Sequence, residues 1–261
     1  MEYGIVIAPR DYRAVRDSGY DYVEFAGREI AALDAPAFET LRQQVTDGPP
    51  CLGLNAYCPP QVVIAGPGFD SDAARRYAEG LAVRAAALGV RVVGVGSPFS
   101  RTLPAGFDRA LAWRQAVRFF RETALAFAGC GIEVCVEALG PCYCNFVNLL
   151  DEAVRLAQEA DQPNLGVVLD FYNMEHSGEA DADLRPYASW IRHAHISDDA
   201  GDPRRRAYLR PDRRAVHAQR MRGLAAAGYD GRISLEIDVA YDAREAARSL
   251  QMLRQTRTKE E

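Results

Sequence analysis

The sequence predicts an α/β fold of the (β/α)₈ (TIM) barrel type, formed by a single domain that spans residues 1–261. Three observations predict this fold. The chain has 261 residues, close to the ~250 that are typical of one such barrel. Eight short apolar segments alternate strictly with longer segments of helical periodicity. No glycine-rich phosphate-binding motif follows the first apolar segment, where a dinucleotide-binding or P-loop fold would carry one.

The eight apolar segments are rich in β-branched and aromatic residues, as buried strands are. They cover residues 3–8, 20–26, 51–57, 90–96, 132–138, 165–171, 191–197 and 232–238. Strict alternation with helices predicts parallel strands covered by those helices. An open doubly wound sheet would show a similar alternation, but eight units favour closure into a barrel.

The segments between the predicted strands have apolar residues at i, i+3, i+4 and i+7, which predicts helices. The clearest examples cover residues 72–89, 111–131 and 149–160. Gly89, Gly131 and Gly228 come just before the next strand, a position that fits a left-handed helix cap.

The composition is that of an ordinary globular enzyme, with 48% hydrophobic and 26% charged residues and a net charge of −5. This charge is too small to indicate a nucleic acid as partner. The first residues form no basic leader, and no run of roughly 18 apolar residues occurs, so we expect a cytoplasmic protein without a membrane partner.

The lysine and cysteine content limits the reaction types and cross-links that this chain can support. The single lysine, Lys259, lies in the charged tail, so a Schiff-base mechanism, which needs a desolvated lysine, is not expected. Six cysteines are interpreted as free thiols, because a chain of this size without a signal peptide needs no disulfide framework. Cys142 and Cys144 flank one tyrosine, but one pair is too few for a structural zinc site.

Four consecutive predicted strands carry one metal-type ligand each near their C-terminal ends, which meet at the mouth of a barrel. Strand five ends in Glu137, strand six in Asp170 and strand eight in Glu236, and strand seven carries His195. A carboxylate is costly to bury unless another charge compensates it, and a divalent cation would compensate all three. The sequence therefore predicts a metal site.

Three carboxylates and one imidazole suit Mn²⁺, which we expect here, with Mg²⁺, Co²⁺ and Zn²⁺ as alternatives. Each residue taken singly has a simpler interpretation: a glutamate could pair with an arginine, and His195 could be a core histidine. The four together favour the metal site.

Several motifs resemble the xylose isomerase-like barrel superfamily of sugar isomerases and epimerases. They are GYDYVEF at 19–25, VEAL at 136–139, GVVLDFYNM at 166–174, IRHAHISD at 191–198 and GYDGRISLEI at 228–237. The resemblance implies that Glu137 and Glu236 bind the metal and also transfer the proton, with Asp170 and His195 completing the ligand set. It thus implies an isomerase or epimerase of a small sugar, sugar phosphate or related polyhydroxy-keto compound.

The chain departs from the ketose epimerases of that superfamily at three positions. Asn173 stands where many relatives carry a histidine, and Tyr143 stands where the epimerases carry a second glutamate. Their arginine falls on Gly201, although three arginines follow in the same loop, at 204–206. The substrate pocket is therefore expected to differ from theirs.

Further residues are expected to bind substrate because they lie at strand ends or in the loops that follow. These are Glu24, Asn55, Asn173, Asp198, Arg204 and Arg206. The arginines could clamp a phosphate or carboxylate, although a basic loop is often simply solvated. His193 shares a strand face with His195 two residues away, and we expect it deeper in the barrel. The apolar segment 58–69 could be a lid over the site or could pack against a second subunit of a homo-oligomer.

Three other functions remain open. A dehydratase or lyase acting on a cyclitol or keto-sugar would use the same metal site. Apurinic endonucleases share this barrel, but their zinc site needs many histidines, whereas this chain has four. The chain is also acidic, which does not favour DNA binding. A non-catalytic sugar-binding barrel would keep the fold without turnover.

Overall fold

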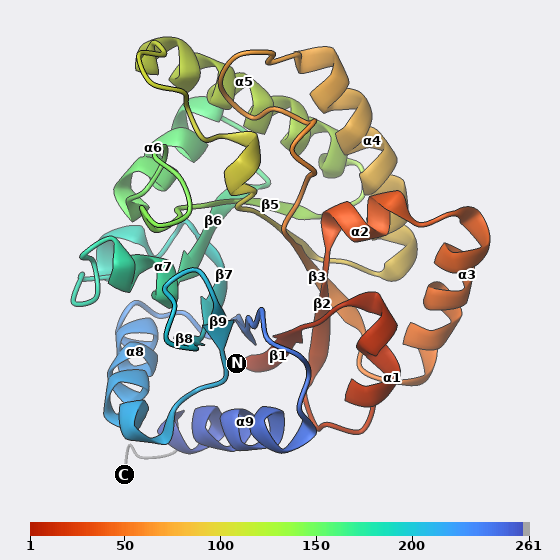
Figure 1. Cartoon of the computed structure of the whole chain (residues 1–261), viewed down its shortest axis with the longest axis vertical. Helices are drawn as coiled ribbons and strands as arrows, with labels where there is room; N and C mark the ends of the chain where they lie inside the picture. The colour runs from red at the N-terminus through yellow and green to blue at the C-terminus, as the bar shows by residue number, and fades with distance from the viewer. Residues whose placement is uncertain (258–261) are drawn as a thin grey trace.

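The computed structural model describes residues 1–257, and within them eight parallel strands close into a barrel in the order β1-β10-β7-β6-β5-β4-β3-β2 (Figure 1). Each strand overlaps one predicted segment, so the predicted closed barrel is confirmed. Their bounds are β1 Glu2–Val6, β2 Tyr22–Ala26, β3 Cys51–Asn55, β4 Val92–Val95, β5 Glu133–Glu137, β6 Leu165–Asp170, β7 Ile191–Ile196 and β10 Arg232–Leu235.

Helices follow the strands and surround the barrel, as Figure 1 shows in a view along the barrel axis. They are α1 Tyr12–Val15, α2 Gly27–Ala32, α3 Ala35–Gln44, α4 Ser71–Leu88, α5 Arg109–Ala128, α6 Leu150–Ala160, α7 Phe171–His176, α8 Arg214–Ala226 and α9 Ala243–Arg257. The helices predicted at 72–89, 111–131 and 149–160 are confirmed as α4, α5 and α6.

Local sequence signals explain where α4 begins and ends. The Asp70 side chain accepts hydrogen bonds from the backbone N–H groups of Asp72 and Ala73 at its N-terminus. Gly89 ends the helix with a φ of +83°, the left-handed conformation that glycine adopts without strain. Gly131 and Gly228 also have positive φ, but they lie two residues or more beyond the last helical residue of α5 and α8.

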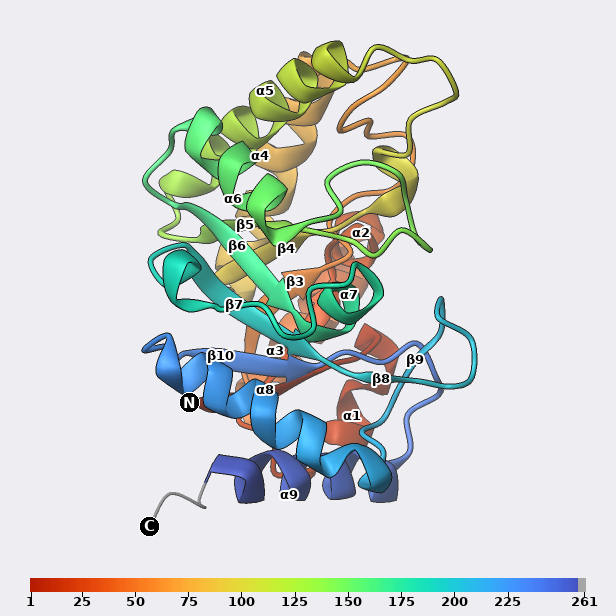
Figure 2. The same ribbon diagram turned by 90° about the vertical axis from the view of Figure 1, so that its left-hand side faces the viewer.

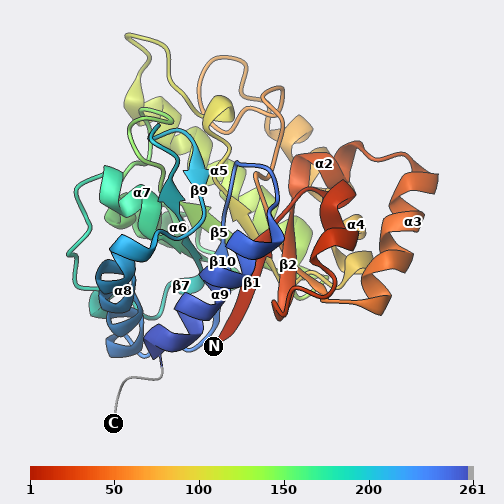
Figure 3. The ribbon, with the colours of Figure 1, turned by 60° about the horizontal axis from the view of Figure 1, so that its bottom comes forward.

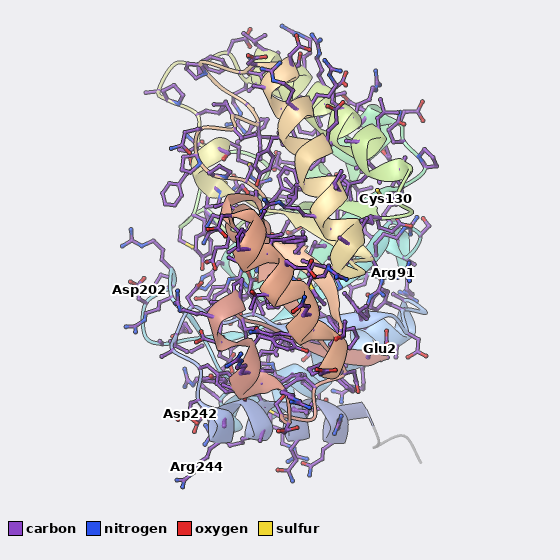
Figure 4. All side chains as sticks on the ribbon, turned by 90° about the vertical axis from the view of Figure 1, so that its right-hand side faces the viewer. Glu2, Arg91, Cys130, Asp202, Asp242 and Arg244 are labelled. Atoms are coloured by element: carbon purple, nitrogen blue, oxygen red, sulfur yellow. The ribbon has the colours of Figure 1, made fainter. Side chains whose placement is uncertain are left out.

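All eight barrel strands run in the same direction, so the barrel has two different ends. Figure 2 shows the strands pointing toward the side on which α7 and the short strands β8 (Asp198–Asp199) and β9 (Arg206–Ala207) lie. In Figure 4, Glu2 and Arg91, which begin or precede strands, lie at one end, whereas Asp202, in the loop after β7, lies at the other. That second end is the mouth of the barrel, where the carboxyl ends of the strands meet.

Strands β8 and β9 form a small antiparallel hairpin within the loop between β7 and α8, which the sequence did not predict. Asp199 pairs with Arg206, and the backbone N–H of Asp238 donates to the Arg206 carbonyl at 3.0 Å. This bond links the hairpin to the loop after β10, and Figure 3 shows β9 beside that loop. Two-residue strands carry no periodic pattern, so sequence alone could not indicate them.

The apolar loop 58–69 packs against its own barrel. Ile64 and Ala65 are buried, and the backbone N–H of Ile64 donates to the Ser100 carbonyl at 2.7 Å. The loop therefore contacts the segment that follows β4 at the mouth. Whether it also serves as a lid or contacts a second subunit stays a prediction.

The structure also bears on the predictions for the cysteines, for membrane spans and for Lys259. All six cysteines are free thiols, as expected. None of the helices within residues 1–257 combines the length and the hydropathy of a membrane span. Lys259 lies outside the described residues.

Candidate metal centre

The four predicted metal ligands converge at the mouth of the barrel. Glu137 and Asp170 are the last residues of β5 and β6, His195 lies near the end of β7, and Glu236 directly follows β10. These four strands are consecutive in the barrel, and His195 is level with Asp170 on one neighbour and Ser234 on the other. One donor atom from each of the four residues lies within 4.8 Å of the others.

The imidazole of His195 directs its Nδ1 atom at the three carboxylates. Nδ1 lies 3.3 Å from Glu236 Oε2, 3.9 Å from Asp170 Oδ2 and 4.0 Å from Glu137 Oε1. The side chains of His195 and Asp170 are at most 1% exposed, whereas that of Glu236 is 15% exposed. The cluster is thus almost completely shielded from solvent, and Glu236 is its most exposed member.

The guanidinium of Arg206 joins this cluster from the hairpin strand β9. It lies 2.8 Å from Asp170 Oδ2, 2.9 Å from Glu236 Oε2 and 3.9 Å from Glu137 Oε1. Its central carbon is 4.8 Å from the centre of the Tyr172 ring, a cation–π distance. Arg206 therefore supplies positive charge to the carboxylates from one side.

The carboxylates differ in how readily they ionise. Burial, together with the charges of Glu236 and Asp170, raises the pKa of Glu137 to about 8. Burial would also raise the pKa of Asp170, but Arg206 and His195 outweigh it and hold that pKa below its usual range. The same two neighbours outweigh burial at Glu236 and lower its pKa. Arg206 and His195 together therefore favour the ionised form of Asp170 and Glu236 but do not offset the effect of burial and neighbouring charge on Glu137.

The donor atoms fit a divalent cation. Although His195 Nδ1 is fully buried, it has no hydrogen-bond partner within residues 1–257, and such unpaired buried atoms are rare in proteins. Carboxylate oxygens and an imidazole nitrogen this close together can surround an ion at bond lengths of about 2.1 Å. The cluster is thus a group that could hold a metal.

Two asparagines hold the carboxylates in place, as only the structure reveals. Asn55, at the end of β3, donates from Nδ2 to Glu236 Oε1 at 2.8 Å. Asn173 donates to Glu137 Oε1 and Asp170 Oδ2, each at 3.1 Å, and its carbonyl oxygen accepts from a backbone N–H at 3.1 Å. Both amides therefore orient proposed ligands. Asn55 also lines a cavity at the mouth, and its contact with substrate stays a prediction.

Four residues expected at the substrate pocket do not line the mouth cavities: Asn173, described above, and Glu24, Asp198 and Arg204. Glu24 is 0% exposed and is enclosed inside the barrel, because it lies in the middle of β2, two residues before the strand ends. Asp198, the first residue of β8, is also 0% exposed, and its carboxylate accepts a hydrogen bond from the backbone N–H of Arg210 at 2.7 Å and lies 2.9 Å from His217 Nε2 on α8. Arg204 is exposed and has Asp202 as an ion-pair partner. The structure therefore does not place these four side chains at the mouth cavities.

A cavity of about 390 Å³ opens above the cluster, a size usual for small-molecule sites. A second cavity of about 490 Å³ adjoins it and shares Arg28, Glu236 and Asp238 with it. The main cavity is lined by Arg28, Phe99, Glu137, Tyr143, Arg206 and Glu236 among others. Both glutamates thus face a space in which a small substrate fits.

Sequence reasoning did not single out Arg28, Phe99 or Asp238 as cavity residues. Asp238 carried a usable signal, because it lies two residues beyond Glu236 and so on the same side of an extended chain. Arg28 lies in the first turn of α2, directly after β2, and Phe99 lies in the short helical turn after β4. Neither position belongs to a periodic pattern long enough to predict the direction of its side chain.

Fold and site together define the class of protein: a (β/α)₈ barrel with three carboxylates and an imidazole gathered at the carboxyl ends of neighbouring strands. The family described as xylose isomerase-like TIM barrel matches residues 12–256. The chain therefore belongs to this family, as its motifs predicted.

Known proteins of similar sequence and structure include sugar epimerases. A D-psicose 3-epimerase of Ruminiclostridium cellulolyticum is 27% identical over 92 residues, which are 35% of this chain and 31% of that protein. The match thus spans about a third of the relative's length. The structure of D-psicose 3-epimerase with D-tagatose from Clostridium cellulolyticum H10 has a TM-score of 0.76 at 18% identity, covering 98% of this chain and 99% of that one. The 3-keto-D-glucoside 4-epimerase YcjR from E. coli has a TM-score of 0.75 at 18% identity, with the same coverage.

Proposed function

We propose that this protein is a divalent-metal-dependent epimerase or isomerase of a small sugar, sugar phosphate or related polyhydroxy-keto compound. One observation carries the proposal. Glu137 and Glu236 line the cavity at the barrel mouth, and the same two carboxylates converge with Asp170 and His195 on one point. Carboxylates that both face the substrate space and belong to a metal-type cluster can bind and transfer protons at the same carbon.

We assign the metal to Glu137, Asp170, His195 and Glu236. Mn²⁺ is the expected ion, and Mg²⁺, Co²⁺ and Zn²⁺ are the alternatives, because all four accept oxygen and imidazole ligands. When bound, such an ion polarises a carbonyl of the substrate and makes the neighbouring C–H acidic.

The chain itself supplies the proton transfer. We assign Glu137 and Glu236 to the two faces of the acidified carbon, where one removes the proton and the other returns it. Return to the opposite face of the same carbon gives epimerisation, and return to the adjacent carbon gives isomerisation. Asn173 and Asn55 hold these two carboxylates in position through their amide groups.

Arg206 is the substrate contact that the geometry supports best among the arginines of its loop. It lines the main cavity and contacts Asp170 and Glu236, so a substrate oxygen close to these carboxylates would also meet its guanidinium. The similar proteins named above act on sugars according to their names, which supports a sugar as substrate.

The proposal is tested by metal analysis of the purified protein, followed by incubation with a panel of ketoses in D₂O. We expect about one bound divalent ion per chain and deuterium at the carbon next to the carbonyl of at least one sugar. A product that has lost the mass of water would instead identify a dehydratase. Bound metal without exchange on any sugar, cyclitol or keto acid would contradict an enzymatic function.

Gly96, which follows β4, provides a prediction about the position of Glu137. A Cβ atom at this position would lie 2.5 Å from Glu137 Oε2, so Gly96→Ala must displace the carboxylate. A displacement of about 1 Å at a catalytic group costs on the order of 100-fold in rate. We therefore expect Gly96→Ala to lower kcat by about that factor, as measured by initial rates on the substrate that exchanges in D₂O.

Gly80→Ala is the matched control, because a Cβ atom there meets no heavy atom within 4 Å and Gly80 lies in the middle of α4. This variant should keep full activity and gain stability of roughly 0.5–1 kcal/mol from the better helix propensity of alanine. Equal activity of the two variants would contradict the placement of Glu137.

A further inference from the structure

Glu24 makes buried polar contacts with three side chains, one of which is the proposed metal ligand His195. The Glu24 side chain extends from β2 across the interior of the barrel toward β7. These two strands are separated by β1 and β10. Oε1 lies 2.5 Å from His193 Nε2, and Oε2 lies 3.3 Å from His195 Nε2. The Ser234 hydroxyl donates to Oε1 as well. All four side chains are at most 1% exposed.

The neighbouring strand β3 leaves room for this carboxylate. A Cβ atom at Gly53 would lie 2.5 Å from Glu24 Cγ and 2.9 Å from Oε2, so a larger residue on β3 would displace Glu24. The site is thus shaped around a charged group in a place where an apolar side chain would otherwise be expected.

We propose that Glu24 is a positioning residue for the metal centre, which acts by fixing the tautomer and the ring orientation of His195. A neutral imidazole carries one N–H, and a carboxylate beside Nε2 keeps the proton on that nitrogen. Nδ1 is then left with a free lone pair. Nδ1 is the atom that faces Glu137, Asp170 and Glu236 and has no hydrogen-bond partner within the described chain. The inference rests on the proposed function only in requiring that this cluster binds a divalent ion.

Glu24, His193 and His195 could themselves be a second group of metal ligands, since their donor atoms lie close together. The geometry argues against this. Two ligands of a tetrahedral ion with bonds of about 2.1 Å lie about 3.4 Å apart, whereas Glu24 Oε1 and His193 Nε2 are 2.5 Å apart, a hydrogen-bond distance. An ion would have to replace this bond and the bond from Ser234. The three residues therefore act as support for the neighbouring centre.

The test is the affinity of the purified protein for Mn²⁺ alone, without sugar, measured by isothermal titration calorimetry. Glutamine has almost the shape of glutamate, but it offers one acceptor and one N–H₂ group in place of two acceptor oxygens. One of the two imidazoles then loses its acceptor, so Glu24→Gln should weaken Mn²⁺ binding by about 10- to 100-fold. Glu133→Gln is the matched control on β5, since Glu133 pairs with Arg192 at 3.4 Å at the far end of the barrel, and it should bind Mn²⁺ like the wild type.

A second measurement uses the unaltered protein and so does not depend on the folding of a variant. The chain has four histidines, so ¹⁵N-histidine NMR of the protein loaded with diamagnetic Zn²⁺ resolves individual rings. We expect His195 to carry its proton on Nε2 and to bind Zn²⁺ through Nδ1. Binding through Nε2, or a folded Glu24→Gln protein with wild-type affinity, would overturn the proposal. A wild-type protein that binds Mn²⁺ but exchanges no sugar proton would contradict the proposed function alone.

Discussion

Glu236→Gln is expected to lower kcat/KM by about 10³-fold, because glutamine cannot accept or return a proton and general acid–base catalysis contributes on this scale. Glu236 is the most exposed member of the cluster and lines both cavities at the mouth. Glu236 Oε1 accepts a hydrogen bond from Asn55 Nδ2, so the side chain is held in place before substrate enters. The loss is measured by initial rates at saturating Mn²⁺, which separates lost proton transfer from weakened metal binding.

Glu79→Gln is the control for this substitution, since Glu79 lies exposed on α4 and forms a surface ion pair with Arg75 at 3.7 Å. Surface pairs of this kind contribute roughly 0–1 kcal/mol, so activity and stability should stay close to those of the wild type. A Glu236→Gln enzyme with more than a tenth of the wild-type rate would show that Glu236 does not transfer the proton.

Arg206→Met is expected to destabilise the metal-free protein by roughly 3–5 kcal/mol, the usual effect of removing one partner from a buried ion pair. The guanidinium is buried and contacts Asp170 and Glu236 at 2.8 and 2.9 Å. Without it, two buried carboxylates face each other with His195 as the nearest compensating group. Urea unfolding in the presence of EDTA measures the loss of free energy.

Added Mn²⁺ should reverse much of this loss, because a divalent ion supplies the positive charge that the carboxylates lack. Binding of Mn²⁺ stabilises the folded state by RT ln(1 + [Mn²⁺]/Kd). Because the carboxylates of Arg206→Met lack their guanidinium partner, we expect a lower Kd and a larger stabilising effect of the ion than in the wild type. Arg204→Met in the same loop is the matched control, since Arg204 is exposed and pairs with Asp202. Equal stabilisation by Mn²⁺ in all three proteins would show that Arg206 and the ion do not act on the same carboxylates.

Much of the fold could be predicted because its signals are local. Eight apolar segments with intervening helical periodicity indicate parallel strands, and parallel strands bring all their carboxyl ends to one side. The four candidate ligands followed from that rule alone, since Glu137, Asp170, His195 and Glu236 each lie at or near the end of a strand. The short hairpin β8–β9 was missed because two-residue strands leave no such pattern.

The same rule failed for residues whose direction depends on the whole barrel. Glu24 was expected at the mouth because it lies near the end of the predicted strand 20–26, yet its side chain turns inward to His193 and His195 across the barrel. Asp198 follows His195 closely in sequence, but its buried side chain contacts Arg210 and His217 instead of a mouth cavity. Glu24 lies two residues before the end of β2, a distance of about 6.6 Å along a strand. That distance is enough to place its side chain inside the barrel instead of at the mouth.

The sequence by itself determined the class of fold and the four side chains that converge near the strand ends, because alternating periodicity and parallel strands leave few other arrangements. Only the tertiary structure decided which other charged side chains contact these four residues. Arg206 comes from a hairpin, and Glu24 from a strand on the far side of the barrel, to contact one cluster. Contacts between segments so distant in sequence depend on barrel closure and loop direction, which no local pattern encodes.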